Sequence, residues 1–195
     1  MFDTLPASVQ AELSQLAERF GQPLIEAAHL GDSGSFAPLG KPDRFGEVCM
    51  VVRRADGSLI TARKEYYPPH IFRLLTGGIG HGEPVHDALL RETAEETGLD
   101  VTVERFLAAL SYRLADEPEP SFYTFAFLLQ ERGGTLGAVD PDERVAAFRM
   151  VPPAGLAALA EALEQLTGSD DHEIGGSWRD WGRFRALGHR LVAAA

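Results

Sequence analysis

The stretch from Gly77 to Leu99 constrains this chain more than any other part of its sequence, because it joins a glycine-rich segment to a helix with recognisable ends. Pro84 fits the first turn of a helix, where the amide hydrogen that proline lacks would have no partner. Gly98 can adopt the left-handed conformation that often follows the last helical residue. Between them, apolar residues recur at helical spacing: Val85, Ala88, Leu89 and Leu90. The sequence therefore predicts a glycine-rich loop followed by an amphipathic helix.

Three acidic residues lie on one side of this predicted helix. Glu92, Glu95 and Glu96 fall within an arc of about 100°. Glu92 and Glu96 are like charges four residues apart, which costs about 0.2–0.5 kcal/mol, and no lysine in the helix offsets them. The acids also lie near the C-terminal end, where the helix dipole disfavours negative charge. A charged helix face exposed to solvent is the usual explanation for such a run, but both penalties count against it. The pattern favours a functional site at which a bound cation compensates for the repulsion.

The same residues resemble the Nudix box of the Nudix hydrolases. That pattern reads Gly, five residues, Glu, seven residues, Arg-Glu, an aliphatic, any residue, Glu-Glu, any residue, Gly and an aliphatic. This chain meets it with Gly77, Glu83, Arg91, Glu92, Glu95, Glu96, Gly98 and Leu99. Thr93 occupies the first aliphatic position. Because threonine has nearly the shape of valine, we expect this departure to weaken packing more than chemistry.

The resemblance implies a metal-dependent reaction at these residues. Glu92, Glu95 and Glu96 would bind Mg²⁺ or Mn²⁺ together with the backbone carbonyl of Gly77, and Glu83 would reach the same cluster from the loop. Arg91 would orient a glutamate of the helix and would not contact the substrate. Hard cations of this kind prefer carboxylate and phosphate oxygens. The implied activity is hydrolysis of a diphosphate linkage, with Glu92, Arg91 and Glu96 as the catalytic candidates.

The general base of this reaction is less well defined than the metal site. In the family it is either a glutamate of the box or an acid on a later loop. The later candidates in this chain are Asp116, Glu117, Glu119, Asp142 and Glu143. Each lies in a proline-rich, polar stretch, where an acid exposed to solvent is the more common case. We therefore favour Glu92 as the base.

The implied fold is a Nudix-like α/β/α sandwich with a mixed central sheet, an N-terminal helical extension and a C-terminal helix. Helical spacing predicts a helix over 6–20, a short helix or strand over 23–30 and a long loop over 31–46. We therefore expect an extension over 1–46 and the Nudix domain over 47–195. Within the domain we expect a hairpin of strands at 47–54 and 58–64, an apolar run at 71–75, strands at 101–114, 122–131 and 144–151, and helices at 156–166 and 177–194.

The net charge and the first residues of the chain indicate which partners and which location to expect. The formal net charge is −11, which argues against a nucleic-acid backbone or an anionic membrane as the main partner. The first residues lack the regions of a signal peptide, and no apolar run approaches the roughly 18 residues of a membrane span, so we expect the cytoplasm. The only cysteine, Cys49, lies in an apolar run and is expected to be a small buried hydrophobe.

Residues that choose the substrate must lie outside the box, and their pattern is weak. Arg63, Lys64 or Arg73 could hold a phosphate, although each is as well explained as a charge at a strand edge. The substrate-binding candidates are Arg63, Arg73 and Tyr67. Tyr66, Tyr67 and His70 could offer a ring to a nucleobase, although aromatic residues beside prolines more often serve in packing.

The C-terminal segment predicts a helix with an aromatic face. Trp178, Trp181, Phe184, Leu187 and Leu191 recur at steps of three and four residues. Packing on the core is the default explanation for such a face. A homodimer through terminal elements is the alternative.

Two classes of function compete. The first is a hydrolase that cleaves a diphosphate linkage in a nucleoside diphosphate joined to another group, such as a nucleotide sugar, a dinucleotide or a nucleoside triphosphate. The second is a nucleotide-binding or regulatory module that keeps the fold without turnover. The intact glutamates favour the enzyme, because a binding module would have no need for so many repelling acids.

Overall fold

The computed structural model describes residues 2–30, 42–114, 117–168 and 170–195. Its centre is a mixed seven-stranded sheet in the order β1-β5-β6-β2-β4-β3-β7. The strands are β1 (Leu24–His29), β2 (Arg44–Arg53), β3 (Leu59–Lys64), β4 (Arg73–Gly80), β5 (Leu99–Arg113), β6 (Phe122–Gly134) and β7 (Val145–Val151). The β1–β5 and β2–β6 pairs are parallel, and the other pairs are antiparallel. The predicted mixed sheet is confirmed.

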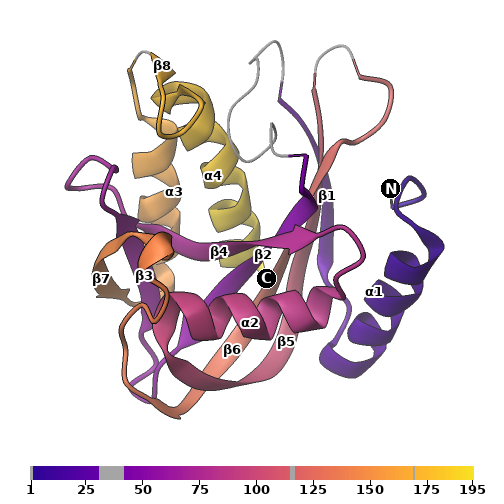
Figure 1. The fold of residues 1–195 in the computed structure, drawn as a ribbon, viewed down its shortest axis with the longest axis horizontal. Helices are drawn as coiled ribbons and strands as arrows, with labels where there is room; N and C mark the ends of the chain where they lie inside the picture. Colours follow the sequence, from indigo (N-terminus) through magenta and orange to yellow (C-terminus); the bar gives the residue numbers. More distant parts are fainter. Residues whose placement is uncertain (1, 31–41, 115–116, 169) are drawn as a thin grey trace.

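Helices cover both faces of this sheet (Figure 1). They are α1 (Ala7–Phe20), α2 (Val85–Thr97), α3 (Leu156–Glu164) and α4 (Trp178–Ala194). Strand β2 shows how one sheet serves two layers, because successive side chains of a strand point to opposite faces. Val48 and Met50 belong to the apolar cluster that includes α1 and α2, whereas Cys49 and Val51 belong to the cluster that includes α3 and α4. The α/β/α sandwich is therefore as expected, and Cys49 is buried in its core.

Strand β4 lies between β2 and β3 in the sheet. Its first residues pair with β3 at Leu74↔Thr61, and its later residues pair with β2 from Leu75 to Gly80. The predicted hairpin between β2 and β3 forms at its turn, where Arg53 pairs with Leu59, and β4 then separates the two strands. The prediction of a glycine-rich loop at Gly77 was wrong, because Gly77, Gly78 and Gly80 lie within β4. The sheet thus carries these glycines directly to the start of α2.

The N-terminal segment contributes to the same sheet. Helix α1 matches its predicted range closely, and the segment over 23–30 is the strand β1, which pairs in parallel with β5 at the sheet edge. The predicted loop over 31–46 lies outside the described residues up to position 41, and β2 begins at Arg44, three positions before the expected start. The division of the chain at residue 46 stays a prediction.

The C-terminal helices pack against each other and against the sheet, and Figure 1 shows α3 and α4 side by side. The aromatic face of α4 enters the core, since Trp181 and Phe184 are 2% and 1% exposed. Ser177 caps this helix by accepting a hydrogen bond from the backbone N–H of Asp180. Packing on the core therefore accounts for this face. Within the described residues, no helix is both long and apolar enough to cross a membrane.

Candidate metal and active site

Helix α2 begins and ends where its sequence predicts. Pro84 precedes its first residue, and Gly98 ends it with φ of 65° and an N–H bond to the carbonyl of Ala94. The helix packs on β4, with Glu92 and Glu96 turned inward at 7% and 1% exposure. Two acids of the predicted cluster are therefore buried beside the sheet.

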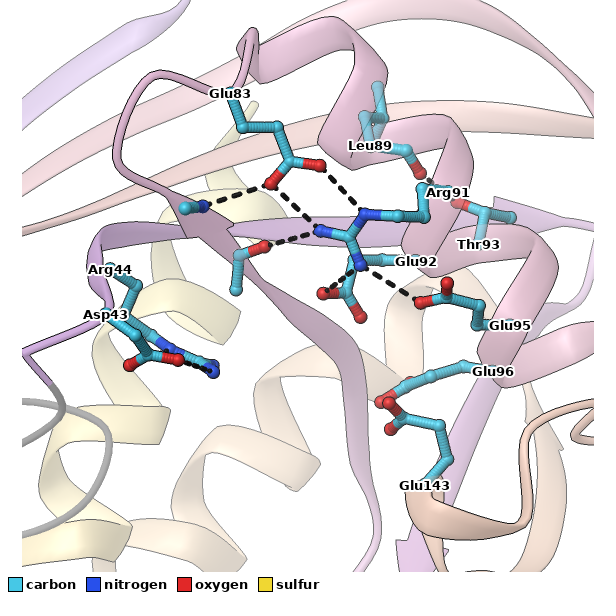
Figure 2. A network of polar contacts seen from close by, with 12 residues as sticks. Asp43, Arg44, Glu83, Leu89, Arg91, Glu92, Thr93, Glu95, Glu96 and Glu143 are labelled. Atoms are coloured by element: carbon cyan, nitrogen blue, oxygen red, sulfur yellow. Dashed lines mark hydrogen bonds and ion pairs between the residues drawn. The ribbon is translucent and has the colours of Figure 1, made fainter.

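Arg91 holds the acidic side chains in place. Its guanidinium donates to both oxygens of Glu83 at 2.8 and 3.0 Å, to Glu92 at 2.9 Å and to Glu95 at 3.0 Å. It also donates to the backbone carbonyl of Gly78 at 3.1 Å. Figure 2 shows this guanidinium between the three carboxylates. The geometry matches the role expected for Arg91, which is to orient glutamates.

The space beside Gly77 is filled by the side chain of Glu92. A Cβ at Gly77 would overlap the carboxylate of Glu92, so any other residue would displace that side chain. The backbone of β4 consequently lies against an acidic side chain. This close approach is the arrangement in which a strand carbonyl and a carboxylate could share one cation.

The acids whose oxygens are placed to share one ion are not the three that the helix pattern predicts. Within the described residues, ligand oxygens of Glu92, Glu95 and Glu143 lie within 4.8 Å of one another. Glu143 comes from η1 (Pro141–Glu143), the turn before β7, and Figure 2 shows it facing α2. Glu96 instead accepts a hydrogen bond from Lys64 at 2.8 Å, because it lies deeper, beside β3. Glu83 bonds to Arg91 and to the N–H of Gly80.

The electrostatics of the cluster favour a cation. Burial raises the pKa of Glu96 to about 7, even though Lys64 opposes the change. Burial also raises the pKa of Glu92 above its usual value, against the effect of Arg91. For Glu143 burial works in the same direction, but the contacts with Lys64 and Glu96 outweigh it and lower the pKa. Burial and neighbouring acids thus penalise the ionised forms of Glu92 and Glu96, and a divalent ion would relieve that penalty.

A cavity of about 380 Å³ opens beside these acids. Glu92, Glu96 and Glu143 line one part of it, and Arg73, Trp181 and Arg185 line another. The cavity therefore reaches from the acidic helix α2 to the C-terminal helix α4.

Comparison with known proteins assigns the family. Residues 43–172 match the model of the NUDIX domain. The chain belongs to the NUDIX domain family. The match covers the sheet from β2 to β7 and the helices α2 and α3, and it ends before α4.

Two curated relatives share about half of this chain. The NAD-capped RNA hydrolase NudC of Chromobacterium violaceum is 29% identical over 93 residues, which are 48% of this chain and 33% of the relative. The protein of the same name from Vibrio atlanticus is 29% identical over 89 residues, which are 45% of this chain and 31% of the relative. This chain therefore aligns with about a third of the length of either relative.

Two solved structures resemble parts of this chain. A MutT described for Aliivibrio salmonicida and Vibrio cholerae has a TM-score of 0.42 and 18% identity, over 59% of this chain and 85% of that one. An ADP-ribose pyrophosphatase from Streptococcus suis has a TM-score of 0.47 and 16% identity, over 79% of this chain and 91% of that one.

Of the predicted substrate residues of this NUDIX domain, Arg73 and Tyr67 line the cavity and Arg63 does not. Arg73 lines the cavity and is 4% exposed. Tyr67 also lines it, but its ring packs against Tyr66, Trp178 and Trp181, with centroids 5.0, 5.8 and 4.9 Å away. Its hydroxyl accepts a hydrogen bond from Nε of Arg73 at 2.9 Å, so Tyr67 orients Arg73 and has no free face for a nucleobase.

Other sequence candidates lie outside the cavity. Arg63 is not among the lining residues, because neighbouring positions of β3 point to opposite faces and Lys64 takes the inward one. The geometry therefore gives no support to a phosphate contact by Arg63. His70 is exposed and does not line the cavity. Among the later acids, Asp142 and Glu143 line it and Glu117 and Glu119 do not, while Asp116 lies outside the described residues.

Three charged residues of the site had no role in the sequence-based prediction. Glu47 and Arg185 form a buried ion pair, with Nη1 of Arg185 at 2.7 and 2.8 Å from the two oxygens of Glu47. Arg44 lies on the cavity rim. A signal existed for the first two. Glu47 directly precedes the apolar run of β2, and Arg185 follows Trp181 by one helical turn on the buried face. Buried charges of this kind need partners.

Proposed function

We propose that this chain is a metal-dependent hydrolase that cleaves the diphosphate linkage in a nucleoside diphosphate joined to another group. Nucleotide sugars, dinucleotides and nucleoside triphosphates are the candidate substrates. The observation that carries the proposal is the convergence of Glu92, Glu95 and Glu143 beside Gly77, at one end of a cavity lined by arginines. Membership of the NUDIX domain family supports it.

The donor set suits Mg²⁺ or Mn²⁺. Both prefer oxygen ligands, and the acids here are partly desolvated, mutually repelling and held by Arg91. Glu92, Glu95 and the carbonyl of Gly77 would hold the cation, and Glu96 would join them by giving up its bond to Lys64. Glu83 would act through Arg91. When bound, such an ion neutralises a diphosphate and lowers the pKa of a coordinated water.

Glu143 is the residue that we propose as the general base, in place of Glu92. It faces the helix from a separate element, lines the cavity, and has a pKa below its usual value, so it is ionised at neutral pH. Glu92 accepts a hydrogen bond from Arg91 at 2.9 Å and would serve as a ligand of the cation. Lys64, which donates to Glu143 at 2.5 Å, would keep that carboxylate oriented toward the cavity.

Two variants separate the base from the metal ligands. Glu143→Gln should lose turnover by about a hundredfold or more and still show thermal stabilisation by Mn²⁺. Glu92→Gln should lose both. Asp87→Asn, an exposed change on the same helix, is the matched control and should change neither. If Glu143→Gln abolishes the Mn²⁺ effect while Glu92→Gln keeps it, the two roles must be exchanged.

The substrate requires a direct assay. The panel should contain ADP-ribose, NAD, a nucleotide sugar, a nucleoside triphosphate and an NAD-capped RNA, each with Mg²⁺ or Mn²⁺, followed by identification of the products. The names of the relatives and of one similar structure motivate the first, second and last members. The net charge of −11 favours small substrates over RNA. Tight binding of one member without turnover of any would favour a nucleotide-binding module.

Two further properties stay predictions from the sequence. One is a location in the cytoplasm. The other is a homodimer through terminal elements, for which the buried aromatic face of α4 offers no support. Light scattering that finds a monomer at micromolar concentration would exclude the dimer.

A further inference from the structure

Two buried arginines from different elements meet in the wall of the cavity. Arg73 of β4 is 4% exposed and Arg185 of α4 is 8% exposed. Each donates from Nη1 to the same hydroxyl, Oγ1 of Thr76, at 3.0 and 3.1 Å. Two guanidinium groups that share one acceptor repel each other, and the low dielectric of a buried site strengthens the repulsion. Such a pair calls for a neighbouring anion.

The protein supplies this anion only in part. The other hydrogen bonds of Arg73 go to neutral groups, the hydroxyl of Tyr67 and its neighbouring carbonyl at Leu74. Arg185 has one carboxylate partner, Glu47. Its Nε is buried without a partner, and the hydrogen bonds within the described part of the chain leave Nη2 of both arginines unused. Nη2 of each arginine therefore remains as a donor for a further oxyanion.

His189 fixes the position of Arg185 relative to Arg73. Its Nε2 accepts a hydrogen bond from the backbone N–H of Leu74 at 2.9 Å, and its Nδ1 lies 2.8 Å from the carbonyl of Arg185. Leu74 follows Arg73 at the start of β4. The histidine thus ties one turn of α4 to the strand that carries the other arginine.

We propose that Arg73 and Arg185 form a two-arginine subsite that binds a phosphate oxyanion of the substrate, and that α4 completes this subsite. The inference rests on the proposed function, because the phosphate belongs to the diphosphate that the acids of α2 would engage through the metal. Guanidinium groups bind phosphate through charge-assisted, often bidentate hydrogen bonds. Glu47 occupies Nη1 of Arg185 and competes with the phosphate for that guanidinium.

The proposal places a specificity residue outside the part of the chain that defines the family. The family match ends at residue 172, and Arg185 lies beyond it. The diphosphate would span the cavity, with one phosphate at the acids and the other at the arginines. Substrates with a single phosphate would fill only one end.

Binding of inorganic pyrophosphate to the metal-free full chain, measured by calorimetry in EDTA, tests the subsite without turnover. The double variant Glu47→Gln/Arg185→Gln removes both charges of the buried pair together, so no uncompensated carboxylate remains to unfold the protein. It should bind pyrophosphate at least about tenfold more weakly. Glu47→Gln alone should bind it about threefold more tightly or better, because a competing carboxylate is lost. Arg179→Gln, an exposed change on α4, should equal the wild type.

The single variant Glu47→Gln also needs a control for charge. Glu173→Gln removes the same charge from the cavity rim without contacting either arginine, and its effect should be smaller than that of Glu47→Gln. If the double variant melts cooperatively and binds pyrophosphate like the wild type, Arg185 is only the counter-ion of Glu47 and the subsite is refuted. Equal effects of the two single variants would also refute it.

These measurements keep the subsite distinct from the hydrolase. Binding that depends on Arg185 in a chain that turns over no member of the substrate panel would retain the subsite and reject the enzyme. Turnover by a chain whose pyrophosphate binding does not depend on Arg185 would retain the enzyme and reject the subsite.

Discussion

Glu12 of α1 caps the helix that carries the acidic cluster. Its two carboxylate oxygens accept hydrogen bonds from the backbone N–H groups of Val85 and His86, both at 2.9 Å. Helix α2 has no side-chain cap of its own, because Pro84 occupies the N-cap position. A residue of the N-terminal segment therefore satisfies two amides that would otherwise lack partners in the first turn. We predict that Glu12→Ala destabilises the protein.

The size of the effect follows from these contacts. Loss of an N-cap side chain costs about 0.5–2 kcal/mol. A carboxylate at a helix N-terminus contributes about 0.3–1 kcal/mol through the helix dipole. Because Glu12 makes two hydrogen bonds of 2.9 Å through one charged group, we expect Glu12→Ala to lower the free energy of unfolding by about 2 kcal/mol, the upper end of the range for an N-cap. For a chain of this length that loss corresponds to about 4–8 °C in Tm. Glu12→Gln keeps an acceptor without the charge and should cost about half as much.

Urea denaturation and a thermal melt of the three proteins measure this directly. Glu18→Ala is the matched control, since Glu18 is an exposed glutamate of the same helix. It should change the free energy of unfolding by less than about 0.5 kcal/mol. Equal losses for Glu12→Ala and Glu18→Ala would show that the cap contributes nothing, and the link between the N-terminal segment and α2 would have to be abandoned.

Three other predictions concern the site and its support. Arg91→Lys should weaken Mn²⁺ binding by about 10–100-fold, because lysine cannot reach several carboxylates at once; an unchanged Mn²⁺-induced shift in Tm would contradict this role. Burial lowers the pKa of His189 to about 4. The neutral imidazole therefore contributes its full stabilisation above pH 6.5, and this contribution is lost as the pH falls from 6.5 toward 4. The loss is at most about 1.4 kcal/mol per pH unit. The difference in unfolding free energy between wild type and His189→Gln should therefore shrink over that range, and a constant difference would be evidence against it. Thr93 is buried, and its hydroxyl donates to the carbonyl of Leu89 at 2.6 Å. Thr93→Val replaces that hydroxyl with a methyl group, whose burial should outweigh the lost hydrogen bond and raise the free energy of unfolding by up to about 1 kcal/mol with turnover unchanged. A loss of activity would show that the hydroxyl matters for chemistry.

Local signals predicted the elements of the fold well. Pro84 and Gly98 mark the ends of α2, because proline and glycine act through their own backbone conformations. The failure at Gly77 has a physical reason. Glycine is typical of loops, but here it lies in a strand, where the absence of Cβ makes room for Glu92 of a neighbouring helix. No pattern within β4 reports that neighbour.

The site was predicted in part. The acids of α2 are related by helical periodicity, which a sequence displays directly. Glu143 has the sequence context of an exposed loop acid, and only the placement of η1 beside α2 brings it to Glu92 and Glu95. The sequence gives no reason to choose between Arg63 and Lys64 as the residue that faces the cavity. The orientation of β3 decides this.

The sequence by itself determined helix α2, its acidic face and its membership of a recognisable family pattern, because these depend on residues within a few helical turns of one another. The tertiary structure decided which groups share the cavity. Glu47 and Arg185 are 138 residues apart and meet because Glu47 of β2 points to the face of the sheet that α4 covers. Contacts of that range depend on strand order and on the face to which each strand points, and the spacing of residues along one segment does not contain either.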